Sequence, residues 1–405
     1  MTTLMQTIPK GYKQTEVGVI PADWDVKEMK DFTLSVASGK SKTTNESGDY
    51  PIYGSTGIIG KRKQADYSGD KILIARVGAN AGTVNKVSGK YCVSDNTLMV
   101  TYPPEIDINF SYYQLINFRI NKIIFGSGQP LVTGGQIKSL VFAIPSNKKE
   151  QSAIATALSD TDALIEKLEK LIEKKKSIKR GAMQELLTGK RRLPGFSGKW
   201  ETKKLGEVAE FDHGRDLPKS DLSEDGPYKC IHYGQLFNEY KELISEIKSR
   251  THTNTGRFYS KANDVLMPTS DVTPRGLATA SCIKEDGVIL GGGILVIRLH
   301  SGYDGLYFSY FVSQNKNSVL RFVKGSTVFH LYANDLANLE VGFPELKEQV
   351  SIATVLSDMD AEIKKLESQL TKYQNLKQGM MQTLLTGKIR LLSKLTPLDS
   401  FLILL

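Results

Sequence analysis

The sequence has few cysteines and no long apolar run, and these absences exclude several classes of protein. Its three cysteines, Cys92, Cys230 and Cys282, stand far apart and form no Cys-x-x-Cys pair. An odd number of widely spaced cysteines argues against a disulfide framework and is typical of a reducing compartment. No segment reaches the roughly 20 apolar residues of a membrane span, and no apolar signal core is present near the first residue. We therefore expect a cytoplasmic protein without membrane contact.

Motifs for catalysis are also missing. None of the Gly-Lys pairs completes the Gly-x-x-x-x-Gly-Lys-Ser/Thr pattern of a phosphate loop, and there is no Gly-x-Ser-x-Gly nucleophile motif or dinucleotide fingerprint. The Asn-Pro-Pro-aromatic loop of amino-methyltransferases is absent as well. Cys230, His232 and His252 lack a fourth ligand at a spacing suited to zinc. The sequence thus predicts no catalytic residue, no metal site and no cofactor on this chain.

Positive charge, by contrast, is in excess. The chain has 53 lysines and arginines against 44 aspartates and glutamates, a formal net charge of +9. This balance favours a polyanionic partner, although charge alone does not identify one. The 405 residues are 40% hydrophobic and 24% charged, a composition that excludes general disorder and allows two or three globular domains.

The most informative feature is an internal repeat. Residues 150–193 and 348–391 align without a gap, and 26 of the 44 aligned residues are identical. Both copies lack proline, and their apolar residues alternate at spacings of four and three, as do the a and d positions of a coiled coil. We predict that each copy is a long helix. The residues predicted to contact the other helix or a partner are Ile154, Leu158, Ile165, Leu168, Ile352, Leu356, Ile363 and Leu366.

Two matched apolar stripes in one chain favour pairing of the helices with each other, and the chain order favours an antiparallel pair with pseudo-two-fold symmetry. At about 1.5 Å per residue, a paired stretch of about 25 to 30 residues is about 40 Å long. One turn of DNA advances ~34–36 Å. Such a pair could hold two domains about one turn apart on one face of a duplex.

Between the helices the sequence is not repeated. Trp24 and Trp200 open segments that differ from each other, and both contain short strand-like runs, glycine-rich turns and one helix-like stretch. The expected fold class is α+β, with two α/β domains separated by two long antiparallel coiled-coil helices. The expected boundaries are an N-terminal segment at 1–22, a first domain at 23–147, a central helix at 148–193, a second domain at 194–345, a C-terminal helix at 346–391 and a tail at 392–405.

The predicted loops of both domains carry side chains that commonly contact nucleic acid. Arginine and lysine suit guanine edges, asparagine and glutamine suit adenine, and lysine, serine or threonine hold phosphates. The candidate residues of the first domain are Lys40, Lys42, Arg62, Lys63, Arg76, Asn80 and Gln129. Those of the second are His213, Arg215, Lys219, Arg257, Thr273, Arg275, Lys324 and Ser326.

The sequence resembles the specificity subunits of type I restriction-modification systems. The matching motifs are Ile20-Pro-Ala-Asp-Trp24, the Pro…Glu-Gln…Ile-Ala…Leu-Ser-Asp…Asp boxes at 145–162 and 344–360, and Leu-Leu-Thr-Gly-Lys at 186–190 and 384–388. The resemblance covers the chain up to Leu391. The second domain departs from it because Leu193-Pro-Gly-Phe-Ser-Gly-Lys-Trp200 replaces the Ile-Pro-x-x-Trp form, and the tail from 392 extends past the usual end.

The resemblance implies a non-catalytic subunit with two target recognition domains, each binding one half of a split sequence in double-stranded DNA. It implies that the helices set the gap between the half-sites and dock two methyltransferase subunits. S-adenosylmethionine, ATP and Mg²⁺ would bind only to these and to the separate restriction and translocation subunits. Two other hypotheses stay open on the sequence: an enzyme that acts alone, and a coiled-coil adaptor without a role in nucleic-acid binding.

Overall fold

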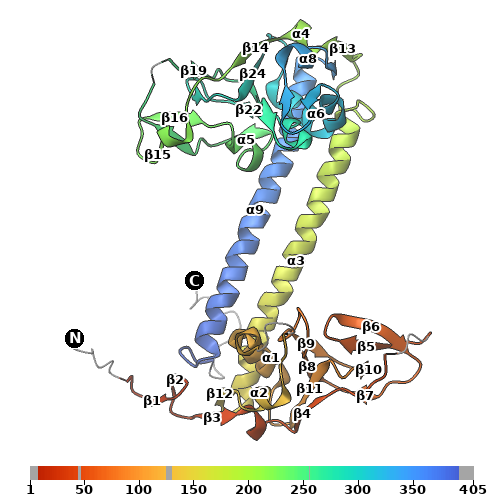
Figure 1. Cartoon of the computed structure of the whole chain (residues 1–405), viewed down its shortest axis with the longest axis vertical. Coiled ribbons are helices and arrows are strands. Elements are labelled where there is room, and N and C mark those ends of the chain that lie inside the picture. Colours follow the sequence, from red (N-terminus) through yellow and green to blue (C-terminus); the bar gives the residue numbers. More distant parts are fainter. Residues whose placement is uncertain (1–7, 44–46, 125–129, 255, 392–405) are drawn as a thin grey trace. The chain divides into compact units, whose positions relative to one another are not determined.

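The computed structural model describes residues 8–43, 47–124, 130–254 and 256–391 (Figure 1). The chain divides into two compact units, unit 1 with Met1–Glu169 and Gln369–Leu405, and unit 2 with Lys170–Ser368. Both divisions fall inside long helices, α3 (Lys148–Leu186) and α9 (Leu346–Leu384), of 39 residues each. Each unit therefore contains half of α3, half of α9 and one α/β domain.

Unit 1 is built on a central antiparallel sheet with the order β4 (Ser35–Ser38), β11 (Thr97–Thr101), β8 (Lys71–Ala75) and β9 (Val84–Val87). A second sheet has the order β6 (Gly57–Arg62), β5 (Tyr50–Gly54), β10 (Lys90–Val93) and β7 (Tyr67–Ser68), in which β10 runs parallel to β5. Two pairs complete the strands, β1 (Tyr12–Thr15) with β2 (Gly18–Pro21) and β3 (Trp24–Glu28) with β12 (Val141–Pro145).

The helices of unit 1 are α1 (Ile108–Phe118), α2 (Gly134–Lys138) and two 3₁₀ turns, Met29–Asp31 and Ile120–Ile123. Helix α1 begins at Asp107, whose carboxylate accepts hydrogen bonds from the backbone N–H groups of Asn109 and Phe110. Its side chains Phe110 and Tyr113 are buried in one core with Ile72 and Val100 of the central sheet. Burial of this helix face against the sheet holds the first domain together.

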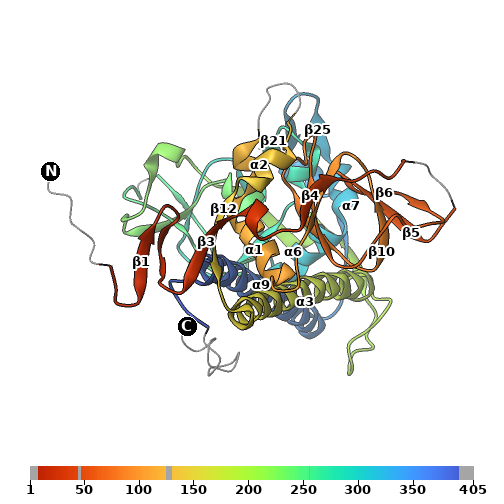
Figure 2. The ribbon, with the colours of Figure 1, turned by 90° about the horizontal axis from the view of Figure 1, so that it is seen from below.

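Unit 2 repeats the frame with additional strands. Its central sheet has the order β14 (Ala209–His213), β24 (Ile294–Leu299), β20 (Val265–Pro268), β22 (Ser281–Ile283) and β17 (Leu243–Ile244). A second sheet has the order β15 (Leu222–Ser223), β18 (Ser249–Thr251), β16 (Tyr228–Ile231), β23 (Ile289–Leu290) and β19 (Phe258–Tyr259). A third has the order β21 (Ser270–Asp271), β26 (Phe329–Leu331) and β25 (Val323–Gly325), of which Figure 2 labels β21 and β25. Strand β13 (Glu201–Lys204) pairs with β27 (Glu340–Phe343).

The helices of unit 2 are α4 (Leu205–Val208), α5 (Gln235–Asn238), α6 (Gly305–Gln314), α7 (Lys316–Leu320), α8 (Ala333–Leu336) and two 3₁₀ turns, Lys219–Asp221 and Pro274–Leu277. The helix-like stretch expected in the second domain is interrupted at Asn315, whose backbone leaves the helical region and separates α6 from α7. Asp304 caps α6 by accepting a hydrogen bond from the N–H of Tyr307, as Asp107 caps α1.

The two long helices form, as predicted, and pair within each unit. In unit 1, Ile154 and Leu158 near the start of α3 share a core with Met380 and Leu384 near the end of α9. In unit 2, Ile352 and Leu356 of α9 share a core with Met183 and Leu186 of α3. The helices therefore run antiparallel in both units. Leu168 and Ile363 are also buried, and Ile165 and Leu366 are half-buried. Within the described ranges, no helix combines the length and the apolar character needed to cross a membrane.

Candidate nucleic-acid interface

Each unit fixes its domain to the helices through a Trp–Glu–Arg cluster. In unit 1, the Arg390 guanidinium donates to both carboxylate oxygens of Glu150, at 2.5 and 2.8 Å, and lies 5.9 Å from the centre of the Trp24 ring. In unit 2, the Arg192 guanidinium donates to both oxygens of Glu348, at 2.5 Å each, and lies over Trp200. Because the arginine follows one long helix and the glutamate begins the other, each cluster ties two helix ends to a strand.

The two Trp–Glu–Arg clusters differ in strength. The Trp24 indole N–H donates to Glu150 at 3.2 Å, and Arg390 also binds both carboxylate oxygens of Asp23 at 2.8 Å. The hydrogen bond from Arg390 keeps the pKa of Asp23 below its usual range. In unit 2, Lys199 stands before the tryptophan in place of an aspartate, and the Trp200 indole nitrogen has no hydrogen-bond partner among the described residues. Among the described residues, Arg192 is therefore the only side chain that pairs with the Glu348 carboxylate.

A second cluster in each unit joins the domain helix to the helix pair. The Tyr113 hydroxyl donates to Asp162 at 2.8 Å, and the Lys377 ammonium lies 2.6 Å from the same carboxylate. Tyr310, Asp360 and Lys179 repeat this arrangement at 2.7 Å each. Burial, and then the nearby carboxylate, raise the pKa of Tyr310 far above its usual value, so the phenol stays protonated and donates. These contacts hold α1 and α6 on the paired helices.

The candidate residues of the first domain fall into two groups. One surrounds the end of β8, where the Arg76 carbonyl accepts from Val132 N–H at 2.8 Å and Val77 forms a bridge with Leu131. The Arg76 side chain is half-buried and donates to Ser38 at 3.3 Å, whereas Asn80 is exposed in the following turn. Gln129 lies outside the described residues.

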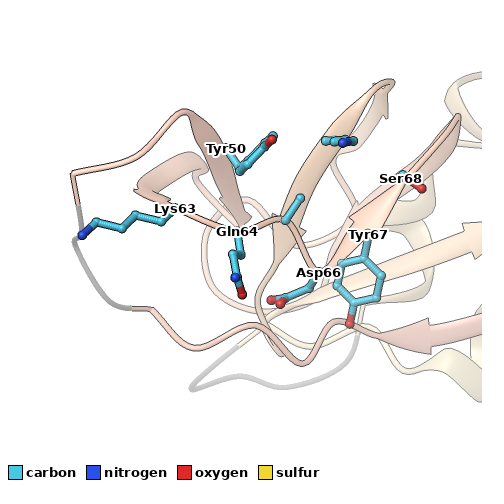
Figure 3. Close-up of a pocket in the computed structure, with 8 residues that line it drawn as sticks. Tyr50, Lys63, Gln64, Asp66, Tyr67 and Ser68 are labelled. Atoms are coloured by element: carbon cyan, nitrogen blue, oxygen red, sulfur yellow. The ribbon is translucent and has the colours of Figure 1, made fainter.

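The other group lies beside the second sheet of unit 1. Arg62 donates to Asp66 at 2.6 Å, and the Lys40 N–H donates to the Tyr67 hydroxyl at 3.0 Å. Lys42 and Lys63 are exposed. A cavity of about 400 Å³ opens here between side chains of mixed polarity (Figure 3). The cavity is lined by Tyr50, Lys63, Gln64, Ala65, Asp66, Tyr67, Ser68 and Lys90. Because Arg62 is paired with Asp66, its charge contributes more to holding this loop than to an outside ligand.

In the second domain, most candidate residues surround two loops. Arg215 and Lys219 are exposed around the segment whose Asp216 carbonyl accepts from Gly292 N–H at 2.6 Å, and His213 is exposed at the end of β14. Thr273, Arg275, Lys324 and Ser326 are exposed on or beside the sheet β21-β26-β25. The Lys324 ammonium lies 2.7 Å from Asp335. Arg257 is separate: its side chain is 5% exposed and bonded to Asp221 at 2.8 Å, a structural position.

The structure also brings together exposed aromatic side chains that the sequence did not single out. The Tyr233 and Phe237 rings meet edge to face at 6.3 Å, and the His330 and Tyr332 rings are stacked at 5.9 Å. Burial, and then the charge of Lys219, lower the pKa of the neighbouring His232, so that imidazole is neutral near pH 7. Aromatic faces beside cations are typical of nucleic-acid surfaces. Residue type alone does not select these rings, because aromatic side chains are more often part of a core than of a binding surface.

Among the described residues, no group of three or more histidine, cysteine, aspartate or glutamate side chains could hold a metal ion. The three cysteines are buried and unpaired, and burial raises the pKa of the Cys230 thiol to about 11. The loops described above expose cations, hydrogen-bonding groups and aromatic rings.

Comparison with known proteins gives one consistent result. A model described as the type I restriction modification DNA specificity domain matches twice, at residues 21–180 and 197–373. A putative type I restriction enzyme specificity subunit of Methanocaldococcus jannaschii is 26% identical and covers 94% of this chain and 97% of its own. A second from the same archaeon is 24% identical, over 92% and 94%. The crystal structure of the S subunit of a type I restriction-modification system from M. genitalium has the same fold, with a TM-score of 0.63, 16% identity, and coverage of 89% and 96%.

Proposed function

This chain belongs to the family of type I restriction-modification DNA specificity proteins, and we propose that its two target recognition domains bind the two halves of one split DNA sequence. The observation that carries the proposal is the pair of units. Each has a similar central-sheet frame and similar contacts to the long helices, but the loops at the end of β8 and of β20 differ in sequence. A common frame with different loops is suited to the recognition of two different base sequences.

Different residues are proposed for different parts of the contact. Exposed Lys40, Lys42 and Lys219 suit phosphates, which set affinity and its dependence on salt. Exposed Asn80, Arg215 and Arg275 stand in loops and suit base edges. In unit 2, the Tyr233 and Tyr332 rings lie among these cations and add stacking or apolar contacts.

The proposal gives the chain no catalytic role. It leaves methylation to two methyltransferase subunits, docked at the helix pair, and leaves DNA translocation and cleavage to separate restriction subunits. S-adenosylmethionine, ATP and Mg²⁺ would then bind to those partners. The duplicated contacts around Asp162 and Asp360 support equivalent docking positions, because two identical partners need two equivalent surfaces. The purified chain, incubated with these cofactors and DNA, should show no turnover, whereas turnover would support an enzyme acting alone.

Methylome sequencing of cells that express the chain with its methyltransferase partner tests the function directly. We expect one split motif with a fixed gap, and replacement of residues 24–145 by the corresponding segment of a relative should change one half only. A single continuous motif, or a change in both halves after the replacement, would contradict the proposal. The absence of any new methylation with an active partner would favour the adaptor hypothesis.

The length of the helix pair should set the gap. Seven residues inserted into both helices, after Glu169 and after Ser368, keep the apolar stripe in register because seven residues make nearly two turns. The added rise of about 10 Å corresponds to about three base pairs at ~3.4 Å each. We expect the methylated motif to keep both halves and gain about three positions between them. An insertion in α3 alone, which breaks the pairing, is the control, and an unchanged gap in the double insertion would exclude this role of the helices.

A further inference from the structure

Two exposed valines stand at the same end of the sheet β21-β26-β25. Asp271, the last residue of β21, pairs with Phe329, the first residue of β26. Val272 follows β21 and Val328 precedes β26, so both valines leave the sheet at this end. Val272 is 72% exposed and Val328 is 45% exposed. Single exposed apolar residues are common on protein surfaces. Val272 and Val328, however, leave one sheet at adjacent positions, although they are more than 50 residues apart in the sequence. We call this pair of exposed side chains the valine tip.

The loop behind this valine tip is held firmly. The Asp271 carboxylate accepts hydrogen bonds from the Val272 N–H and from the Thr273 hydroxyl, both at 2.7 Å. Gly276 lets that carboxylate approach, since a Cβ there would come within 1.8 Å of it. On the other strand, Gly325 has a φ of +128° and allows the Val328 carbonyl to lie against it. The protein therefore fixes the backbone that presents both valines to solvent instead of turning them inward.

The surroundings of the tip indicate its occupant. Arg275 follows Val272 and is exposed, and Lys324 lies in β25 beside the strand that leads to Val328. The Asp271 carboxylate is already bonded within its own loop, and the Asp335 carboxylate is paired with Lys324, which leaves Arg275 as the exposed cation after Val272. An apolar pair flanked by cations complements a duplex whose phosphates surround a hydrocarbon group. In the major groove that group is the C5 methyl of thymine.

We propose that Val272 and Val328 recognise a thymine methyl group within the half-site bound by the second domain. The inference rests on the proposed function and adds a specificity determinant to it. The first domain has Ala79 at the position equivalent to Val272, since Val77 bridges Leu131 as Ser270 pairs with His330. The first domain therefore lacks the valine tip, and thymine methyl recognition of this kind is confined to the second half-site.

Replacement of single thymines by uracil tests the proposal, because it removes the methyl group and leaves the base pair intact. Duplexes carrying the methylome-defined site are titrated with the full chain assembled with its methyltransferase subunits. One uracil in the second half-site should weaken binding about three- to fourfold, the change expected for the roughly 0.8 kcal/mol of one buried CH₂-sized group. Val272→Ser and Val328→Ser, which remove both methyl groups of each valine, should bind thymine and uracil duplexes nearly equally. Val17→Ser, at an exposed valine of unit 1, should retain the wild-type preference.

Three outcomes would overturn the inference: a second half-site without thymine, equal binding of every uracil duplex by the wild type, or an undiminished preference in both valine variants. Loss of subunit assembly in those variants, with an unchanged thymine preference, would identify the tip as a protein-docking surface. Specific binding of the unmodified site by the wild type tests the proposed function independently. A failure of thymine recognition by the two valines can therefore be distinguished from a failure of the proposed function.

Discussion

Replacing Arg192 with methionine should destabilise unit 2, because it leaves the buried carboxylate of Glu348 without its partner. Glu348 is 0% exposed, and Arg192 binds both of its carboxylate oxygens at 2.5 Å. The variant leaves a buried carboxylate without its counter-charge, next to a Trp200 indole that makes no compensating hydrogen bond among the described residues. Urea unfolding of the full chain, followed by the tryptophan fluorescence of a Trp24→Phe background, reports the transition of unit 2.

The equivalent change in unit 1 should cost less. In Arg390→Met, Glu150 keeps the hydrogen bond from the Trp24 indole. The Trp24→Phe background would remove that hydrogen bond. The stability of Arg390→Met is therefore measured in a Trp200→Phe background, in which Trp24 reports the unfolding of unit 1. A double variant, Arg192→Met with Glu348→Leu, removes both charges and should recover most of the stability, since apolar replacement of a buried pair is often neutral. An unchanged urea midpoint in Arg192→Met, as expected for an exposed pair, would show that water reaches Glu348 and that the cluster is dispensable.

Reversing two exposed charges, Arg215→Glu with Arg275→Glu, should weaken binding of the intact DNA site at least about thirtyfold. Each arginine that contacts a base edge contributes about 1–3 kcal/mol, and two such losses add when the contacts are separate. The measurement is a titration of labelled duplex at fixed salt concentration, because phosphate contacts make every affinity depend on salt.

The control for this prediction has the same change in net charge. Lys241→Glu with Lys261→Glu alters two exposed lysines of unit 2 outside the loops that follow β14 and β20. We expect this variant to lose only the general electrostatic part of the affinity. On a duplex with a scrambled second half-site, the two double variants should bind alike. If Arg215→Glu with Arg275→Glu kept the wild-type affinity for the intact site, the second domain would have to bind DNA through another surface.

Several features of the fold could be predicted from the sequence because they depend on neighbours in the chain. Spacings of four and three place apolar residues on one face of a helix, so residues 150–193 and 348–391 predicted two long helices without any tertiary information. The observed helices α3 and α9 end earlier, at Leu186 and Leu384. The repeat without a gap predicted two related halves. The loops with Arg215 and Arg275 were found by residue type, and both side chains are exposed.

Other features depend on contacts between distant residues, and local patterns carry no information on them. Phe237, Gly276 and Asp271 approach one another, and His330 pairs with Ser270, because strand pairing brings together segments from 230 to 332. The same limit applies to Arg62 and Arg257, chosen as DNA contacts by residue type. The structure pairs the first with Asp66 and nearly buries the second beside Asp221.

The two long helices, the two-domain organisation and the family follow from the amino-acid sequence, because periodicity and repetition are properties of the order of residues. Which of the many lysines and arginines are available to a ligand depends on the folded chain. In the folded chain, Arg192 and Arg390 also neutralise glutamates 156 and 240 residues away, and two valines stand together at one sheet end. Exposure and ion pairing are set by what packs beside a side chain, and those neighbours exist only once the chain has folded.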